Sequence, residues 1–239
     1  MQIEYIYNSN AIEGNTLTLR ETQLILEEGT TIEGKSFREH LEARNHPKAI
    51  EYIERIASRG LKEQDILALH HLIMKGIEKE SGRYRSSEVR IAGANSLPPP
   101  AYELPFLMKE LIDWCNQNPD ELRPIELAST LHHRFVHIHP FHDGNGRVAR
   151  LLMNLVLIRG GYPASTILNT DRKKYYDVLK RADNDDIAPL ANFVAAAVEQ
   201  SLDLWLRALE PTKEDDILLS LTEASKGSPY SSEYLSLLA

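Results

Sequence analysis

The sequence predicts a nearly all-α fold, and two kinds of pattern lead to that prediction. Apolar residues recur every three or four positions through most of the 239 residues, as they do on the buried face of a helix. Glycine, proline and capping residues separate the periodic segments at intervals typical of helix ends. The segments expected to be helical are 2–13, 18–28, 36–59, 63–78, 103–117, 124–138, 145–159, 171–182 and 189–209.

The ends of these segments carry recognisable signals. Gly14 follows the first segment, and a glycine often ends a helix. Thr18 opens the second segment with Glu21 three residues later, the spacing of a capping box in which each side chain binds the other's main-chain N–H. Gly60 and Gly160 follow the third and seventh segments. The boundaries are therefore expected close to these residues.

One stretch, 81–102, departs from helical periodicity. It contains two glycines, three consecutive prolines at 98–100 and the short strand-like piece Val89-Arg90-Ile91-Ala92. Such a piece between turn-forming residues is typical of a β-hairpin. We therefore expect a small hairpin near 86–100 in an otherwise helical chain.

A change of composition at Pro211 marks off a C-terminal tail, 210–239. Two short apolar patterns flank Gly227 and resemble the opening of a helix-turn-helix. The tail is interpreted either as a truncated accessory domain of that kind or as a helical pair that packs on the main domain.

Composition and charge favour a cytoplasmic protein. The formal net charge of −8 disfavours non-specific binding to nucleic acid or to an anionic membrane. Cys115 is the single cysteine, so an intrachain disulfide is impossible. The N-terminus is too polar for a secretory signal, and no apolar run approaches the ~18 residues of a membrane span.

The stretch His139–Arg150 concentrates polar residues just before the most apolar helix. It contains two glycines around Asn145, and it reads as a loop that ends on the first turn of segment 145–159. Free main-chain N–H groups at a helix start bind anions, and Arg147 and Arg150 share one helix face and add positive charge. The sequence therefore predicts a phosphate-binding site.

Two side chains in this stretch fit nucleotide chemistry. His139 opens the loop, where an imidazole beside phosphate can act as general base. Asp143 could hold Mg²⁺, which binds one or two carboxylates and phosphate oxygens, or cap the following helix. His133 and His137 have the i,i+4 spacing of a zinc pair, but no carboxylate or cysteine cluster offers a third ligand. Magnesium is therefore preferred to zinc.

These residues resemble a known family. Residues 139–150, HPFHDGNGRVAR, are similar to the Fic motif H-x-F-x-[DE]-G-N-G-R-x-x-R, with every fixed position filled. Flanking stretches also resemble the family: Gly82-Arg83-Tyr84-Arg85, Leu152-Met153-Asn154 and Tyr175-Tyr176. The resemblance extends over roughly residues 1–205. The resemblance implies a Fic-type helical domain at 16–209, with the hairpin at 86–100 as its flap.

The resemblance also implies an activity, the transfer of AMP from ATP to a Ser, Thr or Tyr hydroxyl of a target protein docked at the flap. His139 would be the catalytic base, Asp143 the Mg²⁺ ligand, and Phe141 an inward anchor of the loop. The expected ATP-binding residues form an anion hole, hold the β- and γ-phosphates or line the nucleotide site: Gly144, Asn145, Gly146, Arg147, Arg150, Asn154 and Tyr175. In this assignment Asn145 lies near the α-phosphate.

A second motif lies in the first helix. Ser9-Asn10-Ala11-Ile12-Glu13-Gly14 resembles the inhibitory sequence [ST]-x-x-x-E-[GN] of the family. Ser9 and Glu13 are four residues apart and face the same way on a helix. The resemblance implies that Glu13 pairs with Arg150 and makes ATP bind unproductively, so 1–15 would be an inhibitory helix.

Two other functions compete with AMP transfer. Some relatives with an N-terminal inhibitory helix remove AMP from a modified protein, and Glu13 would then position the attacking water. A transcriptional regulator with a DNA-binding tail is disfavoured by the negative charge and the incomplete tail, so nucleic acid is not the expected partner. The expected partners are ATP and a target protein, and such proteins often form homodimers.

Overall fold

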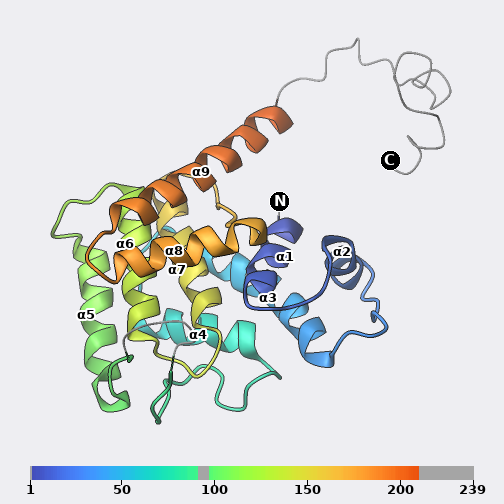
Figure 1. Ribbon diagram of the computed structural model, residues 1–239, viewed down its shortest axis with the longest axis horizontal. Coiled ribbons are helices and arrows are strands. Elements are labelled where there is room, and N and C mark those ends of the chain that lie inside the picture. Colours follow the sequence, from blue (N-terminus) through green and yellow to red (C-terminus); the bar gives the residue numbers. More distant parts are fainter. Residues whose placement is uncertain (1, 91–96, 210–239) are drawn as a thin grey trace. The chain divides into compact units, whose positions relative to one another are not determined.

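The computed structural model describes residues 2–90 and 97–209, and this part of the chain is helical (Figure 1). Its elements are α1 Gln2–Ile12, α2 Leu19–Glu27, α3 Phe37–Ile56, α4 Glu63–Met74, the 3₁₀ turn η1 Ala101–Glu103, α5 Leu104–Gln117, α6 Pro124–Ile138, α7 Asn145–Arg159, the 3₁₀ turn η2 Asn169–Asp171, α8 Arg172–Ala182 and α9 Ala188–Leu209. All nine segments expected to be helical are helices in this part of the chain.

Most predicted boundaries agree with the structure within one to three residues. The Thr18–Glu21 capping box at the start of α2 is present in both directions. The expectation that segment 63–78 stays helical to its end is wrong, because α4 ends at Met74. Lys75 leaves the helical region with ψ 123°, and the Asn45 side-chain amide donates to the carbonyls of Ile73 and Lys75.

Two other expectations concern parts outside the described residues. Within the described flanks of the expected hairpin, 86–90 and 97–100, the structure contains no strand, and 91–96 lie outside the described residues. The tail at 210–239 also lies outside them. No helix in the described part of the chain is both long and apolar enough to cross a membrane.

Helix α7 occupies the centre of the core. Every residue from 147 to 157 is buried, and α7 packs against α6, α3, α4 and α1 (Figure 1). Most of these residues are apolar, as expected of a helix in the centre of a core. Arg147, Arg150 and Asn154 are buried on this helix as well, and buried polar groups of this kind need partners to offset the loss of hydration. The chain up to Asp203 forms one compact unit, and the partners of these buried polar groups lie within that unit.

Candidate active site

The loop between α6 and α7 is held by its own turns and by one aromatic anchor. His139 ends α6 with φ +50°, and Gly144 precedes α7 with φ +78°. A Cβ on Gly144 would lie 3.0 Å from Met74 Sδ, so that position combines a left-handed backbone with little space. Phe141 is fully buried and stacks on His70, with ring centroids 3.7 Å apart. Phe141 thus packs inward, as expected.

His70, which the sequence did not single out, holds the end of this loop. Its Nδ1 accepts the Gly82 N–H at 2.8 Å, so Nε2 carries the proton and donates to the main-chain oxygen of Asp143 at 3.1 Å. Burial lowers the pKa of His70 to about 4, which keeps the ring neutral. His70 therefore connects the loop after α4 to the Fic-like loop through a neutral imidazole.

His139 has the protonation state that a general base requires. Its Nδ1 lies 3.3 Å from the carbonyl of Val136, which can only accept, so Nδ1 carries the proton and Nε2 keeps its lone pair. Burial lowers the pKa of His139, and the nearby Arg85 charge acts in the same direction, although the bond to Val136 and nearby carboxylates oppose them. The imidazole is therefore neutral at pH 7.

A cavity of about 530 Å³ opens beside His139. This volume is within the range of small-molecule sites. Its lining comes from the residue after α1, from two residues of the 86–100 stretch, from α6, the loop 139–144 and α7, and from α8 and the residue after it. These residues are Glu13, Arg90, Pro98, His133, Val136, His137, His139, His142, Asp143, Gly144, Asn145, Gly146, Arg150, Arg172, Tyr175, Tyr176, Leu179, Lys180 and Asp183. The predicted base, anion loop and inhibitory glutamate therefore share one cavity.

Helix α1 meets α7 at Arg150, which is 1% exposed. Arg150 Nε donates to Ser9 Oγ at 3.0 Å, and its Nη2 donates to the Ser9 carbonyl at 2.8 Å and to Glu13 Oε1 at 2.7 Å. The Glu13 carboxylate also lies on the anion loop, because a Cβ on Gly146 would be only 2.3 Å from Glu13 Oε1. One carboxylate thus occupies both features expected to bind phosphate.

Two contacts fix the end of α1 at this position. Arg172 Nε donates to the carbonyl of Ile12 at 2.7 Å, and the Arg172 guanidinium lies over the Tyr176 ring. The Asn8 side-chain oxygen accepts the Asn169 N–H at 2.8 Å. A cation at a helix C-terminus also complements the helix dipole. Together these contacts position Glu13 over the cavity.

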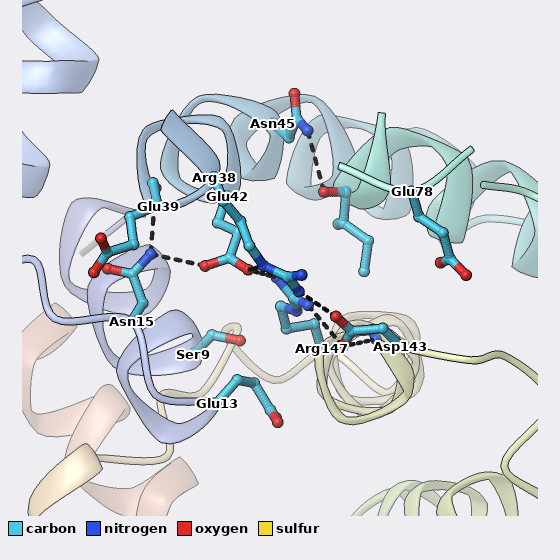
Figure 2. A network of polar contacts seen from close by, with 12 residues as sticks. Ser9, Glu13, Asn15, Arg38, Glu39, Glu42, Asn45, Glu78, Asp143 and Arg147 are labelled. Atoms are coloured by element: carbon cyan, nitrogen blue, oxygen red, sulfur yellow. Dashed lines mark hydrogen bonds and ion pairs between the residues drawn. The ribbon is translucent and has the colours of Figure 1, made fainter. Parts of the chain in front are cut away.

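Asp143 belongs to a chain of ion pairs at the other side of the anion loop (Figure 2). Arg38 of α3 binds one of its oxygens, and Arg147 Nη2 lies 3.2 Å from the other. Burial alone would raise the pKa of Asp143, but Arg147, the Gly144 N–H and Arg38 outweigh burial and lower it. Asp143 is therefore ionised, as a Mg²⁺ ligand must be.

Glu42 of α3 completes this network. Its Oε1 lies 3.0 Å from Arg147 Nη1 and 3.1 Å from Arg38 Nε, and its Oε2 accepts from the Asn15 amide at 2.9 Å (Figure 2). Asn15 directly follows the Ser9–Gly14 motif. The buried guanidinium of Arg147 thus faces Glu42 and Asp143.

The chemistry of the donors fits a magnesium–nucleotide complex better than a metal held by protein alone. Asp143 is an ionised, half-exposed carboxylate at the cavity. Among the described residues, no three metal-binding side chains come together. A cation at Asp143 would therefore take its other ligands from phosphate oxygens and water, which is the usual arrangement for Mg²⁺.

Comparison with known proteins places the chain in a family. Residues 60–157 match the model of the Fic/DOC family. The crystal structure of a Fic domain containing signaling protein from Bacteroides thetaiotaomicron superposes with a TM-score of 0.81 at 36% identity, covering 87% of this chain and 86% of that one. This chain belongs to the Fic family. The predicted resemblance and the helical fold class are thereby confirmed.

Other members of the Fic family are similarly close. Fic-1 from C. elegans superposes with a TM-score of 0.80 at 34% identity, covering 87% of this chain and 63% of the other. "Protein adenylyltransferase Fic" of Drosophila willistoni is 40% identical over 228 residues, which are 94% of this chain and 45% of the relative. The chain thus spans a little under half the length of the curated relatives it matches.

Three of the residues expected at the ATP site of this Fic chain have their polar groups bound elsewhere. The Asn154 amide binds the main-chain N–H and carbonyl of Ser165, at 2.8 and 3.1 Å, and lies outside the cavity. Arg147 also lies outside the cavity lining, against Glu42. The Asn145 amide binds the N–H and carbonyl of Phe141, so its side chain braces the Fic loop. Their contact with ATP stays a prediction.

Tyr175 lines the cavity, as expected of an ATP-site residue, but its hydroxyl is bound to His132 Nε2 at 2.8 Å. Several residues of the site were not found from the Fic-like motifs. Arg38, Glu42, His70 and Arg172 come from other helices, and no local sequence pattern connects them to the loop. Arg85 falls in a stretch noted only for its resemblance to the family.

Proposed function

We propose that the chain is a self-inhibited protein adenylyltransferase that transfers AMP from ATP to a Ser, Thr or Tyr hydroxyl of a target protein. One observation supports this more than any other: the carboxylate of Glu13 rests on Gly146 and Arg150 in the same cavity as the neutral His139. The site thus holds a base and an anion cradle, and the cradle is filled by an acidic side chain of the same chain.

The proposed reaction needs one proton transfer and one displacement at phosphorus. His139 Nε2 takes the proton of the target hydroxyl while the hydroxyl oxygen attacks the α-phosphorus of ATP. The bond between the α-phosphorus and the oxygen that bridges it to the β-phosphate breaks. Pyrophosphate leaves, and AMP stays on the target. The main-chain N–H groups of 145 and 146, at the start of α7, and the guanidinium of Arg150 would hold the phosphates, while the Gly144 N–H donates to Asp143. Mg²⁺ held by Asp143 would neutralise phosphate charge.

Target and partners are proposed from the same geometry. Arg90 and Pro98, two described residues of the expected flap at 86–100, line the cavity beside His139. A target segment placed there would bring its hydroxyl to Nε2. The homodimer and the cytoplasmic location remain predictions.

Paired radiolabels test the proposal directly. The Glu13→Gly variant is incubated with cell lysate and ATP labelled at either the α- or the γ-phosphate. Lysate without the variant gives the background, since its own kinases transfer the γ-label. AMP transfer predicts that protein acquires α-label above this background and no additional γ-label. Phosphoryl transfer would give the opposite result, and a protein that only binds nucleotide would add neither label.

Removal of AMP from a modified protein is the second candidate, and the position of Glu13 favours it. The Glu13 side chain is 29% exposed and faces the cavity, so it could orient a water toward a bound AMP–protein ester. This candidate predicts that Glu13→Gly abolishes AMP release from protein labelled beforehand by that variant. Release of AMP by Glu13→Gly at an undiminished rate would exclude this role of Glu13 and leave AMP transfer as the single candidate.

The ion pair between Arg38 and Asp143 predicts an effect on cation binding. A cation at Asp143 has to displace Arg38, and exposed pairs of this kind contribute at most ~1 kcal/mol. Arg38→Ala is therefore expected to tighten Mn²⁺ binding about 2–5-fold in the presence of a non-hydrolysable ATP analogue, measured by electron paramagnetic resonance. Arg44→Ala, an exposed arginine on the same helix, is the control. Unchanged or weaker binding would contradict the assignment of Asp143.

The lowered pKa of His139 sets the expected pH dependence. A base must be neutral to act, so the rate should fall only as the pH drops through the pKa of His139, which lies below its ordinary value of about 6.5. The kcat/KM of Glu13→Gly should therefore be level from pH 8 to 7 and keep more than half its maximum at pH 6.5. A midpoint at or above 6.5 would show that burial does not act on this ring.

A further inference from the structure

Arg85 is a buried arginine whose side chain, among the described residues, binds only main-chain carbonyls. Its side chain is enclosed, and the residue is 2% exposed. Nε donates to the carbonyl of His139 at 2.9 Å, Nη1 to that of Ser87 at 3.1 Å, and Nη2 to that of Pro99 at 2.5 Å. One guanidinium therefore joins three separate points of the chain: the catalytic histidine and the two ends of segment 87–99.

The main chain reinforces this connection. The Arg85 N–H donates to the carbonyl of Pro140 at 2.9 Å, so Arg85 binds two consecutive carbonyls of the catalytic loop. His139 has a left-handed backbone, with φ +50°, which is strained for a non-glycine residue and turns its carbonyl out of α6. That carbonyl is the one Arg85 binds.

Stability alone gives a poor reason for this arrangement. In the described part of the chain, no carboxylate lies within ion-pair distance of Arg85. A buried charge without a counter-ion is costly, and in some proteins such a group is retained because it fixes one conformation. Burial also lowers the pKa of Arg85, with the nearby Glu88 opposing.

We infer that Arg85 is a positioning residue that fixes the two ends of segment 87–99 relative to His139, and so sets the distance between a docked target and the base. The inference rests on the proposed function, in which the target binds beside this segment. His139 itself has further supports, because its N–H bonds the Phe135 carbonyl at 3.0 Å and its ring bonds Val136. Loss of Arg85 should therefore displace the main chain at Ser87 and Pro99 more than the base.

This distinction determines which reactions should suffer. AMP transfer to protein needs both the base and a positioned target, and a misplacement of about 1 Å can cost on the order of 10²-fold. AMP transfer to water, seen as slow release of AMP from ATP, needs the base and the anion loop only. An Arg85 variant should lose the first reaction and keep the second.

The test uses Arg85→Lys in the Glu13→Gly background. Lysine keeps the charge but cannot bind three carbonyls in fixed directions. Protein labelling in lysate with α-labelled ATP is expected to fall about 10–100-fold, whereas release of AMP by the isolated protein should change less than about 2-fold. Arg83→Lys, an exposed arginine two residues earlier, should change neither. Unchanged protein labelling, or an equal loss of both reactions, would overturn the inference.

Hydrogen exchange tests the inference without any activity. In Arg85→Lys, the amide of residue 85, which donates to the Pro140 carbonyl, should exchange at least about 10-fold faster while the amides of α7 keep their protection. Unchanged exchange at the amide of residue 85 would overturn the role of Arg85. If the Glu13→Gly parent labels no protein at all, the proposed function fails, and the exchange result still decides about Arg85.

Discussion

His139→Ala in the Glu13→Gly background is expected to reduce AMP transfer to protein about 10²–10⁴-fold, the usual cost of losing a general base. The buried ring binds Val136 through Nδ1 and has Nε2 free for the target hydroxyl. Alanine leaves the anion loop and Arg150 in place. The labelling rate with α-labelled ATP is the measurement.

Two comparisons make this result specific. Binding of a non-hydrolysable ATP analogue should change less than about 3-fold in His139→Ala, because alanine removes the base and leaves the main-chain N–H groups that hold phosphate. His71→Ala, at an exposed histidine bonded to Ser81, should keep the parent rate. A variant that binds the analogue normally and still labels protein at the parent rate would remove His139 from the mechanism.

Glu13→Gly alone is expected to raise protein labelling about 10-fold or more over the unmodified chain. The Glu13 carboxylate holds the Arg150 guanidinium at 2.7 Å and covers Gly146. A hydrogen bond between charged groups contributes about 1.5–3 kcal/mol, and each 1.4 kcal/mol is a factor of ten. Glycine frees both Arg150 and the anion loop for the phosphates of ATP.

Two further substitutions separate the charge of Glu13 from its size and from the stability of α1 as causes of the inhibition. Glu13→Gln keeps the size of the side chain and one acceptor oxygen but loses the charge, so its labelling rate should lie between those of the unmodified chain and Glu13→Gly. Glu4→Gly tests whether a glycine in the same N-terminal segment activates the protein by loosening α1, and it should increase labelling less than Glu13→Gly does. Equal rates in the unmodified chain and Glu13→Gly would show that Glu13 does not inhibit.

The sequence predicted the helices and the central loop because those features depend on local physics. Apolar periodicity gave the bounds of α7, and the glycines of 139–150 predicted a turn onto a helix start with free N–H groups. The ion pair between Glu13 and Arg150 does not depend on local sequence. Residues 137 positions apart carry no common local pattern, so that contact was expected only through the resemblance to the Fic family.

The contacts that the sequence did not reveal are between helices. Glu42 reads as an ordinary charged residue of α3, with Arg38 four residues earlier, yet its carboxylate is the counter-ion of the buried Arg147. Asn154 reads as part of the nucleotide site but holds the Ser165 main chain. Which partner satisfies a buried polar group depends on the packing of distant helices, and one sequence does not contain that information in readable form.

The central claim is that Glu13 and His139 act on one site, the first by occupying it and the second by catalysis there. The most direct test is the double variant Glu13→Gly/His139→Ala, assayed for protein labelling by α-labelled ATP beside both single variants. The double variant is expected to label protein no faster than His139→Ala, because an open anion loop without its base cannot transfer AMP. Labelling by the double variant at the rate of Glu13→Gly would contradict it.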